Sequence, residues 1–138
     1  AAPALAGPDQ AGTTVSLSSY AGRWVLVNFA ASWCVPCQQE TPQLLTFAAD
    51  AARTGGSAPP AIVTVSYDHA DLANLRRFLA ARHAPWPVVD DPQASVRWGV
   101  GGLPESYLVD PEGRVVAKVT GGVVARDLEK LTGEFPAS

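Results

Sequence analysis

Residues 24–37 read WVLVNFAASWCVPC and hold the features that decide the fold. The nearly continuous apolar run from Trp24 to Ala30 is typical of a strand buried on both faces at the centre of a sheet. From Cys34 to about Arg53 the apolar residues recur with helical spacing, and a proline is tolerated in the first helical turn. The stretch therefore predicts a central strand that turns directly into a helix, with two cysteines at the turn.

The remaining chain alternates short strands with helices. Asp71 is placed to cap the second helix, and Pro42 should kink the first helix rather than end it. Strands that alternate with helices predict an α/β fold, in which helices cover both faces of a central sheet. Further strands are expected at residues 15–17, 61–67, 86–89, 106–109 and 115–119, and further helices at residues 71–82, 93–98 and 125–132.

Length and composition predict one domain. The chain has 138 residues, of which 47% are hydrophobic and 17% are charged, and this is enough for a single hydrophobic core. Residues 1–12 are rich in Ala, Pro and Gly without periodicity, so we expect a loose N-terminal lead-in followed by one domain over residues 13–138. The formal net charge is -3 and the basic residues are scattered, which argues against nucleic acid as a partner.

The N-terminal residues carry no recognisable leader. No apolar run reaches the length of about 18 residues that spans a bilayer, and the sequence contains no methionine. We therefore expect that residue 1 is not the translational start and that a signal peptide or a membrane anchor has been removed upstream of it.

Cys34 and Cys37 are the only two cysteines, and they stand where the buried strand turns into the helix. A CxxC pair in this context is typical of a redox site. Two cysteines in the first helical turn can close a small disulfide ring. The free backbone N–H groups and the dipole at a helix N-terminus stabilise an anion, so the Cys34 thiol should ionise more readily than a free cysteine.

Two alternative roles for the cysteine pair stay open. A buried structural disulfide is one, although it does not need a helix N-terminus. A zinc site is the other, and it needs four ligands. The two histidines, His69 and His83, are spaced by 14 residues, which matches no usual zinc pattern.

The chain resembles the thioredoxin superfamily, and within it the extracytoplasmic TlpA-like and cytochrome c maturation proteins of the ResA and DsbE (CcmG) type. The resemblance covers about residues 15–131 and is carried by two separated motifs, residues 25–37 with Glu40 and Pro42, and the stretch GVGGLPESYLVD at residues 99–110. It implies a thioredoxin-like fold, with a central mixed β-sheet flanked by helices on both faces and an extra N-terminal β-hairpin.

The same resemblance implies a set of site residues. Pro104 becomes the cis-proline that faces the cysteine pair, and it counts with Cys34 and Cys37 among the catalytic residues. The backbone of Leu103 would pair with an extended substrate chain, and Glu105 would form a lip of the substrate groove. Two residues between the cysteines, Val35 and Pro36, are expected to contact the substrate as well.

Three further residues near the cysteines carry expectations. Glu40 follows Cys37 by three residues on one helix face, where it could exchange a proton with the resolving thiol, or it could be a solvated carboxylate favoured by the helix N-terminus. Asn28 stands where cytosolic thioredoxins have an acidic residue, which increases the importance of Glu40. Trp33 could pack in the core or flank the substrate sulfur.

The predicted activity is thiol-disulfide exchange outside the cytosol, with no cofactor and no metal. The expected partners are a cysteine-containing protein, such as apocytochrome c or its maturation machinery, and a membrane or soluble redox partner that resets the pair; the chain is expected to be a monomer. Peroxidase activity is not expected, because Ala31 stands where peroxiredoxins need a threonine. The alternative function is copper binding and delivery, which rests on the two soft thiolate ligands alone. Copper-delivering relatives space their cysteines by three residues and use a distant histidine, whereas His83 falls too early in this chain.

Overall fold

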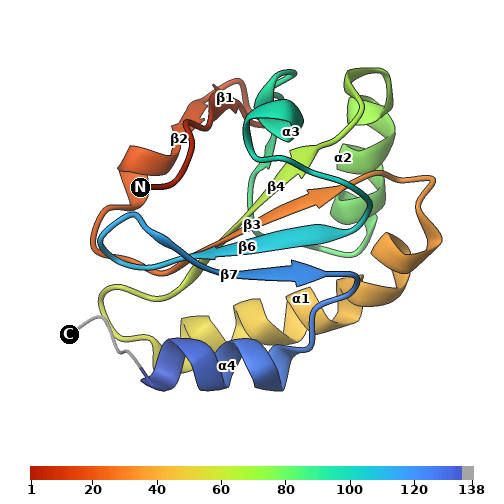
Figure 1. Ribbon diagram of the computed structural model, residues 1–138. Coiled ribbons are helices and arrows are strands. Elements are labelled where there is room, and N and C mark those ends of the chain that lie inside the picture. Colours follow the sequence, from red (N-terminus) through yellow and green to blue (C-terminus); the bar gives the residue numbers. More distant parts are fainter. Residues whose placement is uncertain (135–138) are drawn as a thin grey trace.

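A five-stranded mixed sheet forms the centre of the computed structural model, which describes residues 1–134 (Figure 1). Its strand order is β5-β4-β3-β6-β7. The central strand β3 pairs in parallel with β4 and antiparallel with β6, while β4–β5 is a parallel pair and β6–β7 an antiparallel pair. The strands are β3 (Val25–Ala30), β4 (Ala61–Ser66), β5 (Val88–Val89), β6 (Glu105–Val109) and β7 (Val115–Thr120).

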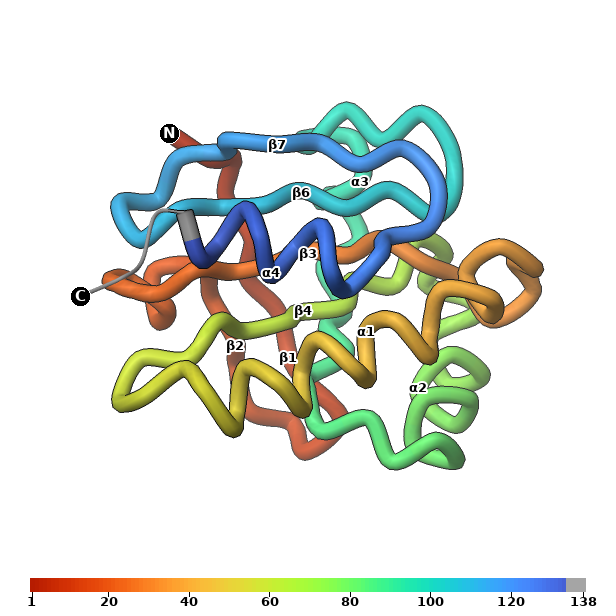
Figure 2. Tube along the Cα trace, turned by 90° about the horizontal axis from the view of Figure 1, so that it is seen from below, coloured from red at the N-terminus to blue at the C-terminus, as the bar shows by residue number. Residues whose placement is uncertain are grey.

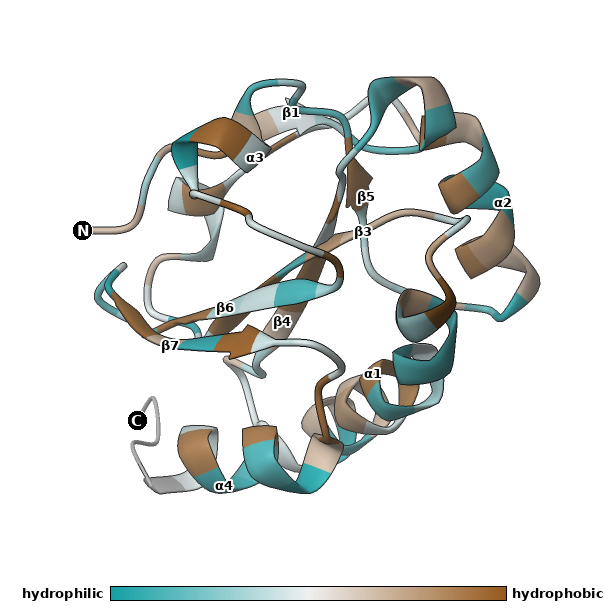
Figure 3. Cartoon of the chain, turned by 45° about the vertical axis from the view of Figure 1, so that its right-hand side comes forward, coloured by the Kyte–Doolittle hydropathy of each residue, from teal (hydrophilic) through white to brown (hydrophobic). Residues whose placement is uncertain are grey.

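Three helices cover one face of this sheet. They are α1 (Val35–Thr54), α2 (Leu72–Ala81) and α4 (Ala125–Glu134), and their apolar residues share one core cluster with Leu26 of β3. Figure 1 shows α1 and α4 beneath the strands, and Figure 2 shows the two helices side by side in front of them. Figure 3 shows polar and apolar residues alternating along α4, as a helix with one buried side requires. The helix α1 continues through Pro42.

The other face is covered by the short helix α3 (Ala94–Arg97) and by an N-terminal two-stranded antiparallel sheet, β1 (Ala6–Pro8) with β2 (Thr14–Ser16). Phe29, Trp98 and Tyr107 form an aromatic cluster here, with ring centroids 5.3 to 6.1 Å apart. The predicted thioredoxin-like fold, with a mixed sheet between helices and an extra hairpin at the N-terminus, is confirmed. Two 3-10 turns, η1 (Leu17–Tyr20) and η2 (His69–Asp71), complete the described elements.

Residues 1–12 differ from the loose lead-in that their composition predicts. The strand β1 lies within them, Leu5 is only 3% exposed, and the Trp98 indole donates a hydrogen bond of 3.1 Å to the Ala4 carbonyl oxygen. A side chain at Gly7 would overlap the backbone of Asp90. Contacts with residues far along the chain order this segment, and periodicity within it cannot reveal them.

Two smaller expectations also change. The strand expected at residues 86–89 is reduced to Val88–Val89. Asp71 does stand at the position before α2, but its side chain makes no capping hydrogen bond to that helix. Its carboxylate accepts hydrogen bonds from Ser32 instead.

Leu5→Ala should lower the free energy of unfolding by about 2–3 kcal/mol, because it opens a cavity between the N-terminal segment and the sheet. Urea titration followed by tryptophan fluorescence measures this. The control Val96→Ala, at a side chain that is 77% exposed, should change stability by less than about 0.5 kcal/mol. Equal, small effects of both changes would show that the N-terminal segment is not part of the core.

Candidate active site

Cys34 and Cys37 form a disulfide at the N-terminus of α1, with their Cα atoms 5.2 Å apart. Cys34 is the N-cap residue, and its Sγ accepts a hydrogen bond of 3.2 Å from the backbone N–H of Cys37. Each cysteine is only 5% exposed. The sulfur that would carry negative charge after reduction therefore already faces a helix N–H group, as the sequence analysis expects.

An open groove of about 490 Å³ lies against Cys34. Its walls come from the cysteine loop, from the residue that follows β4 and from the loop before β6, where the Leu103–Pro104 peptide bond is cis, as the resemblance implies. None of the lining side chains is charged: Trp33, Val35, Pro36, Tyr67, Gly102 and Leu103. The fold thus brings four of the expected substrate-contacting residues, Trp33, Val35, Pro36 and Leu103, to one apolar surface beside the disulfide.

Trp33 does not pack in the core. It is 59% exposed and lines the groove, so its position is not that of a core packing residue. An exposed indole beside a reactive sulfur offers a large apolar surface to a partner.

Tyr67 was missed by the sequence analysis, which treats it only as the end of a strand. It is 42% exposed, lines the groove, and its backbone N–H donates to Ala30. The strand pattern could have indicated this position, because β3 and β4 are parallel neighbours and their carboxyl ends lie at the same edge of the sheet. The residue that follows β4 must then stand next to the loop that follows β3.

Glu105 is not at the lip of the groove, which corrects that expectation. It is buried in β6, where its carboxylate accepts hydrogen bonds from Gly101 N–H (3.1 Å) and Tyr107 Oη (2.9 Å) and lies 3.5 Å from Lys118 Nζ. Burial tends to raise the pKa of Glu105, but these donors and the Lys118 charge outweigh it and lower the pKa. Glu105 therefore holds the loop before Pro104 in place through its hydrogen bond with Gly101.

Glu40 is buried beneath the cysteines and is not the solvated carboxylate considered as an alternative. Its oxygens accept hydrogen bonds from Asn28 Nδ2 (2.9 Å) and from the backbone N–H of Val123 (3.1 Å). Burial raises its pKa, and the two hydrogen bonds oppose the rise only in part. Glu40 and Cys37 line the same internal cavity of about 10 Å³, so the carboxyl group and the inner cysteine share one environment.

Asn28 connects Glu40 to a buried polar chain that the sequence analysis did not predict. Its Nδ2 also donates to Ser106 Oγ (3.0 Å), and its Oδ1 accepts from Thr64 Oγ1 (3.0 Å). Thr64 in turn accepts from the Trp86 indole (2.9 Å). Because every member is hydrogen-bonded, the chain can hold the Glu40 carboxyl group in a fixed orientation within the core.

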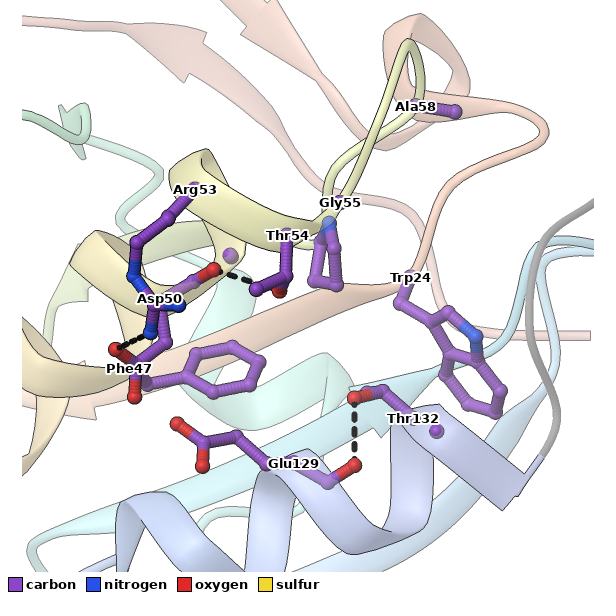
Figure 4. A pocket seen from close by; sticks show the side chains of 12 residues that line it. Trp24, Phe47, Asp50, Arg53, Thr54, Gly55, Ala58, Glu129 and Thr132 are labelled. Atoms are coloured by element: carbon purple, nitrogen blue, oxygen red, sulfur yellow. Dashed lines mark hydrogen bonds and ion pairs between the residues drawn. The ribbon is translucent and has the colours of Figure 1, made fainter.

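A second cavity, of about 350 Å³, lies between α1 and α4 at the other end of α1 (Figure 4). Asp50, Arg53 and Glu129 line it together with Trp24 and Phe47. At 1.5 Å per helical residue, Asp50 lies about 20 Å along α1 from Cys37 and about 24 Å from Cys34. This cavity contains none of the expected site residues and plays no part in the chemistry described here.

Metal ligands do not gather around the cysteines. Within residues 1–134, no group of three or more His, Cys, Asp and Glu side chains is arranged to hold a metal ion. His83 is exposed just beyond α2, so the three-ligand set that copper delivery would use is not assembled there.

Comparison with known proteins agrees with a redox-active cysteine pair at this site. The family model described as AhpC/TSA family matches residues 1–118. The thiol:disulfide interchange protein CycY of Rhizobium leguminosarum is 39% identical over 104 residues, which cover 72% of this chain and 51% of that protein. The thiol-disulfide oxidoreductase ResA of Geobacillus thermodenitrificans is 30% identical over 131 residues, which cover 94% of this chain and 72% of that protein.

A solved structure extends the agreement to three dimensions. The crystal structure named as thiol:disulfide interchange protein DsbE from Chlorobium tepidum superposes with a TM-score of 0.80 at 32% identity and covers 99% of this chain and 94% of that one. The chain spans about half the length of the Rhizobium protein (51%), so the comparison concerns the domain that carries the cysteine pair.

The raised pKa of Glu40 predicts a pH-dependent difference between the oxidised wild type and Glu40→Gln. A carboxyl whose folded pKa exceeds its ordinary value of 4.5 contributes stability that is complete below that value and is lost as pH rises through the folded pKa. The wild type should therefore lose stability relative to Glu40→Gln as pH rises above 4.5. Urea unfolding of both proteins from that pH upward to about pH 8 measures the difference, and a constant difference would contradict the raised pKa.

Proposed function

Since the chain belongs to the AhpC/TSA family and carries a thiol-disulfide oxidoreductase domain of the ResA, CycY and DsbE type, we propose that its cysteine pair exchanges electrons with cysteines of exported proteins. The observation that carries the proposal is the disulfide at the N-terminus of α1, which opens onto an uncharged groove. No cofactor is required, because the two sulfur atoms carry both electrons.

In the reductive direction, the Cys34 thiolate attacks one sulfur of a substrate disulfide and releases the other as a thiolate, which takes up a proton. This leaves a mixed disulfide between Cys34 and the substrate. The Cys37 thiolate then attacks Cys34 Sγ and releases the second substrate thiolate, so the substrate gains two electrons and the enzyme ends as the Cys34–Cys37 disulfide. The same steps in reverse oxidise a dithiol substrate.

Glu40 is proposed to take the proton of the Cys37 thiol before the second step and to return it in the reverse reaction. It lines the same cavity as Cys37, and burial raises its pKa above the ordinary carboxyl value. A proton acceptor works best when its pKa lies near the working pH. The bonds from Asn28 and Val123 keep the carboxyl group oriented while its charge changes.

The groove supports an extended, cysteine-bearing polypeptide as the substrate. Within residues 1–134, no hydrogen bond is made by the backbone N–H or C=O of Leu103. Both groups are therefore available for strand-like pairing with a bound chain. The uncharged lining favours apolar side chains on either side of the substrate cysteine. We propose that such a chain is apocytochrome c or a component of its maturation machinery.

The proposed compartment lies outside the cytosol, in the periplasm or cell envelope, as the resemblance to ResA-type proteins and their relatives suggests. A membrane or soluble redox partner would return the cysteine pair to its working state. Among residues 1–134, no helix combines the length and apolar character needed to cross a membrane.

The reduction potential of the pair determines the direction of the reaction. For a protein that keeps apocytochrome thiols reduced, we expect a midpoint below about -220 mV at pH 7. Equilibration in thiol/disulfide buffers followed by tryptophan fluorescence or mass measurement gives this value. A midpoint above about -180 mV would instead indicate a donor of disulfides, and the absence of any transition would exclude exchange chemistry.

Cys37→Ser should trap the intermediate. Without the resolving thiol, reaction with a peptide disulfide should stop at a mixed disulfide on Cys34, which mass spectrometry identifies. Cys34→Ser should form no such adduct and should lose at least about 99% of exchange activity, because Cys34 borders the open groove whereas Cys37 lines only the internal cavity. Equal adduct formation by both variants would contradict the assigned order of attack.

A further inference from the structure

Ser32, two residues before Cys34, is held at three of its atoms. Its backbone N–H donates to Asp71 Oδ2 at 2.7 Å, and its hydroxyl donates to Asp71 Oδ1. Its carbonyl oxygen accepts from Gln38 Nε2 at 2.8 Å. The loop that leads into the cysteine pair is therefore tied to the start of α2 on one side and to the first turns of α1 on the other.

Asp71 makes these bonds in place of the capping bond that its position would ordinarily provide. It stands directly before α2, yet its side chain makes no hydrogen bond to that helix, and it is only 5% exposed. A buried carboxylate is costly unless hydrogen-bonded donors face it. Here both of its oxygens accept from Ser32, 39 residues away in the sequence, so the pair is a specific long-range contact.

Beyond Ser32, the loop is held by two backbone hydrogen bonds of Cys34, whose N–H donates to the Ala31 carbonyl oxygen (3.3 Å) and whose carbonyl oxygen accepts from Gln38 N–H (3.1 Å). The side chains of Trp33, Val35 and Pro36 are exposed and do not anchor the loop by packing in the core. Cys34 is buried, but in the oxidised form the bond to Cys37 helps to fix it, and reduction removes that bond. None of the hydrogen bonds of Ser32 involves a cysteine atom.

We infer that Asp71 is a positioning residue for thiol exchange, which acts through Ser32 to hold the reduced Cys34 at the N-terminus of α1. In that position Cys34 Sγ accepts a hydrogen bond from the backbone N–H of Cys37, and Cys34 borders the groove. The inference rests on the proposed attack by Cys34, because a pair that never becomes reduced would not need this support.

The test uses the Cys37→Ser protein, in which Cys34 is the only thiol, and measures its second-order rate of alkylation by iodoacetamide at pH 7. Adding Ser32→Ala should lower the rate constant by about fivefold, because the thiolate spends less time against the helix N–H groups. Adding Ser32→Thr, which keeps the hydroxyl and the backbone N–H, should leave it within about twofold. Neither change alters the charge of the protein.

A matched pair of aspartate changes separates positioning from charge. Asp71→Asn and Asp68→Asn each remove one negative charge from the same segment, but Asp68 bonds Ala70 N–H and does not contact Ser32. Asp71→Asn should react about fivefold more slowly than Asp68→Asn. Circular dichroism and thermal unfolding establish that each variant is folded under the conditions of the assay.

Two results would overturn the inference: rates for Ser32→Ala and Asp71→Asn within twofold of their controls, or a Ser32→Thr protein as slow as Ser32→Ala. Failure of the proposed function is distinguishable, because it would show in the parent Cys37→Ser protein as a thiol no more reactive than free cysteine. The ratio between variant and parent reports on the Ser32–Asp71 contact in either case.

Discussion

The structure depends on one constraint, which is that β3 is buried on both faces and ends at Ala30. A strand in this position is almost wholly apolar, with Asn28 the exception in β3, and it pairs on both sides, in parallel with β4 and antiparallel with β6. Because β3 is paired on both sides up to its end, the position of the residues that follow it is fixed relative to the sheet. The short loop after Ala30 then sets the disulfide at the start of α1, and the carboxyl end of β4 contributes Tyr67 to the same surface.

The same strand carries the one polar residue that reaches beneath the cysteines. Asn28 links Glu40 on α1, Ser106 on β6 and Thr64 on β4. The Glu40 carboxyl group is thus held by donors from two directions, β3 and the segment that includes Val123. The proton transfer proposed for Glu40 requires such support, because an unpaired polar atom in the core would destabilise one of its two protonation states.

The sequence predicted the parts of the molecule that local patterns encode. The apolar run of β3, the helical spacing of α1 and the cysteine spacing predicted the central unit, and resemblance added the cis peptide before Pro104. Pairings between distant residues were not predictable from these patterns. Asp71 was expected to cap its own helix but bonds Ser32, Glu105 was expected at a groove but is turned inward to Gly101, and β1 is ordered by contacts made far along the chain.

The two edges of the sheet also affect how copies of the protein behave toward one another. One edge strand, β5, is only two residues long, and the other, β7, carries Lys118 and shifts register where it pairs with Leu108 and Val109 of β6. Short, charged or irregular edges are poor templates for the addition of another strand. Both edges of the central sheet therefore resist the addition of a strand from another chain, and association between copies through these edges is disfavoured.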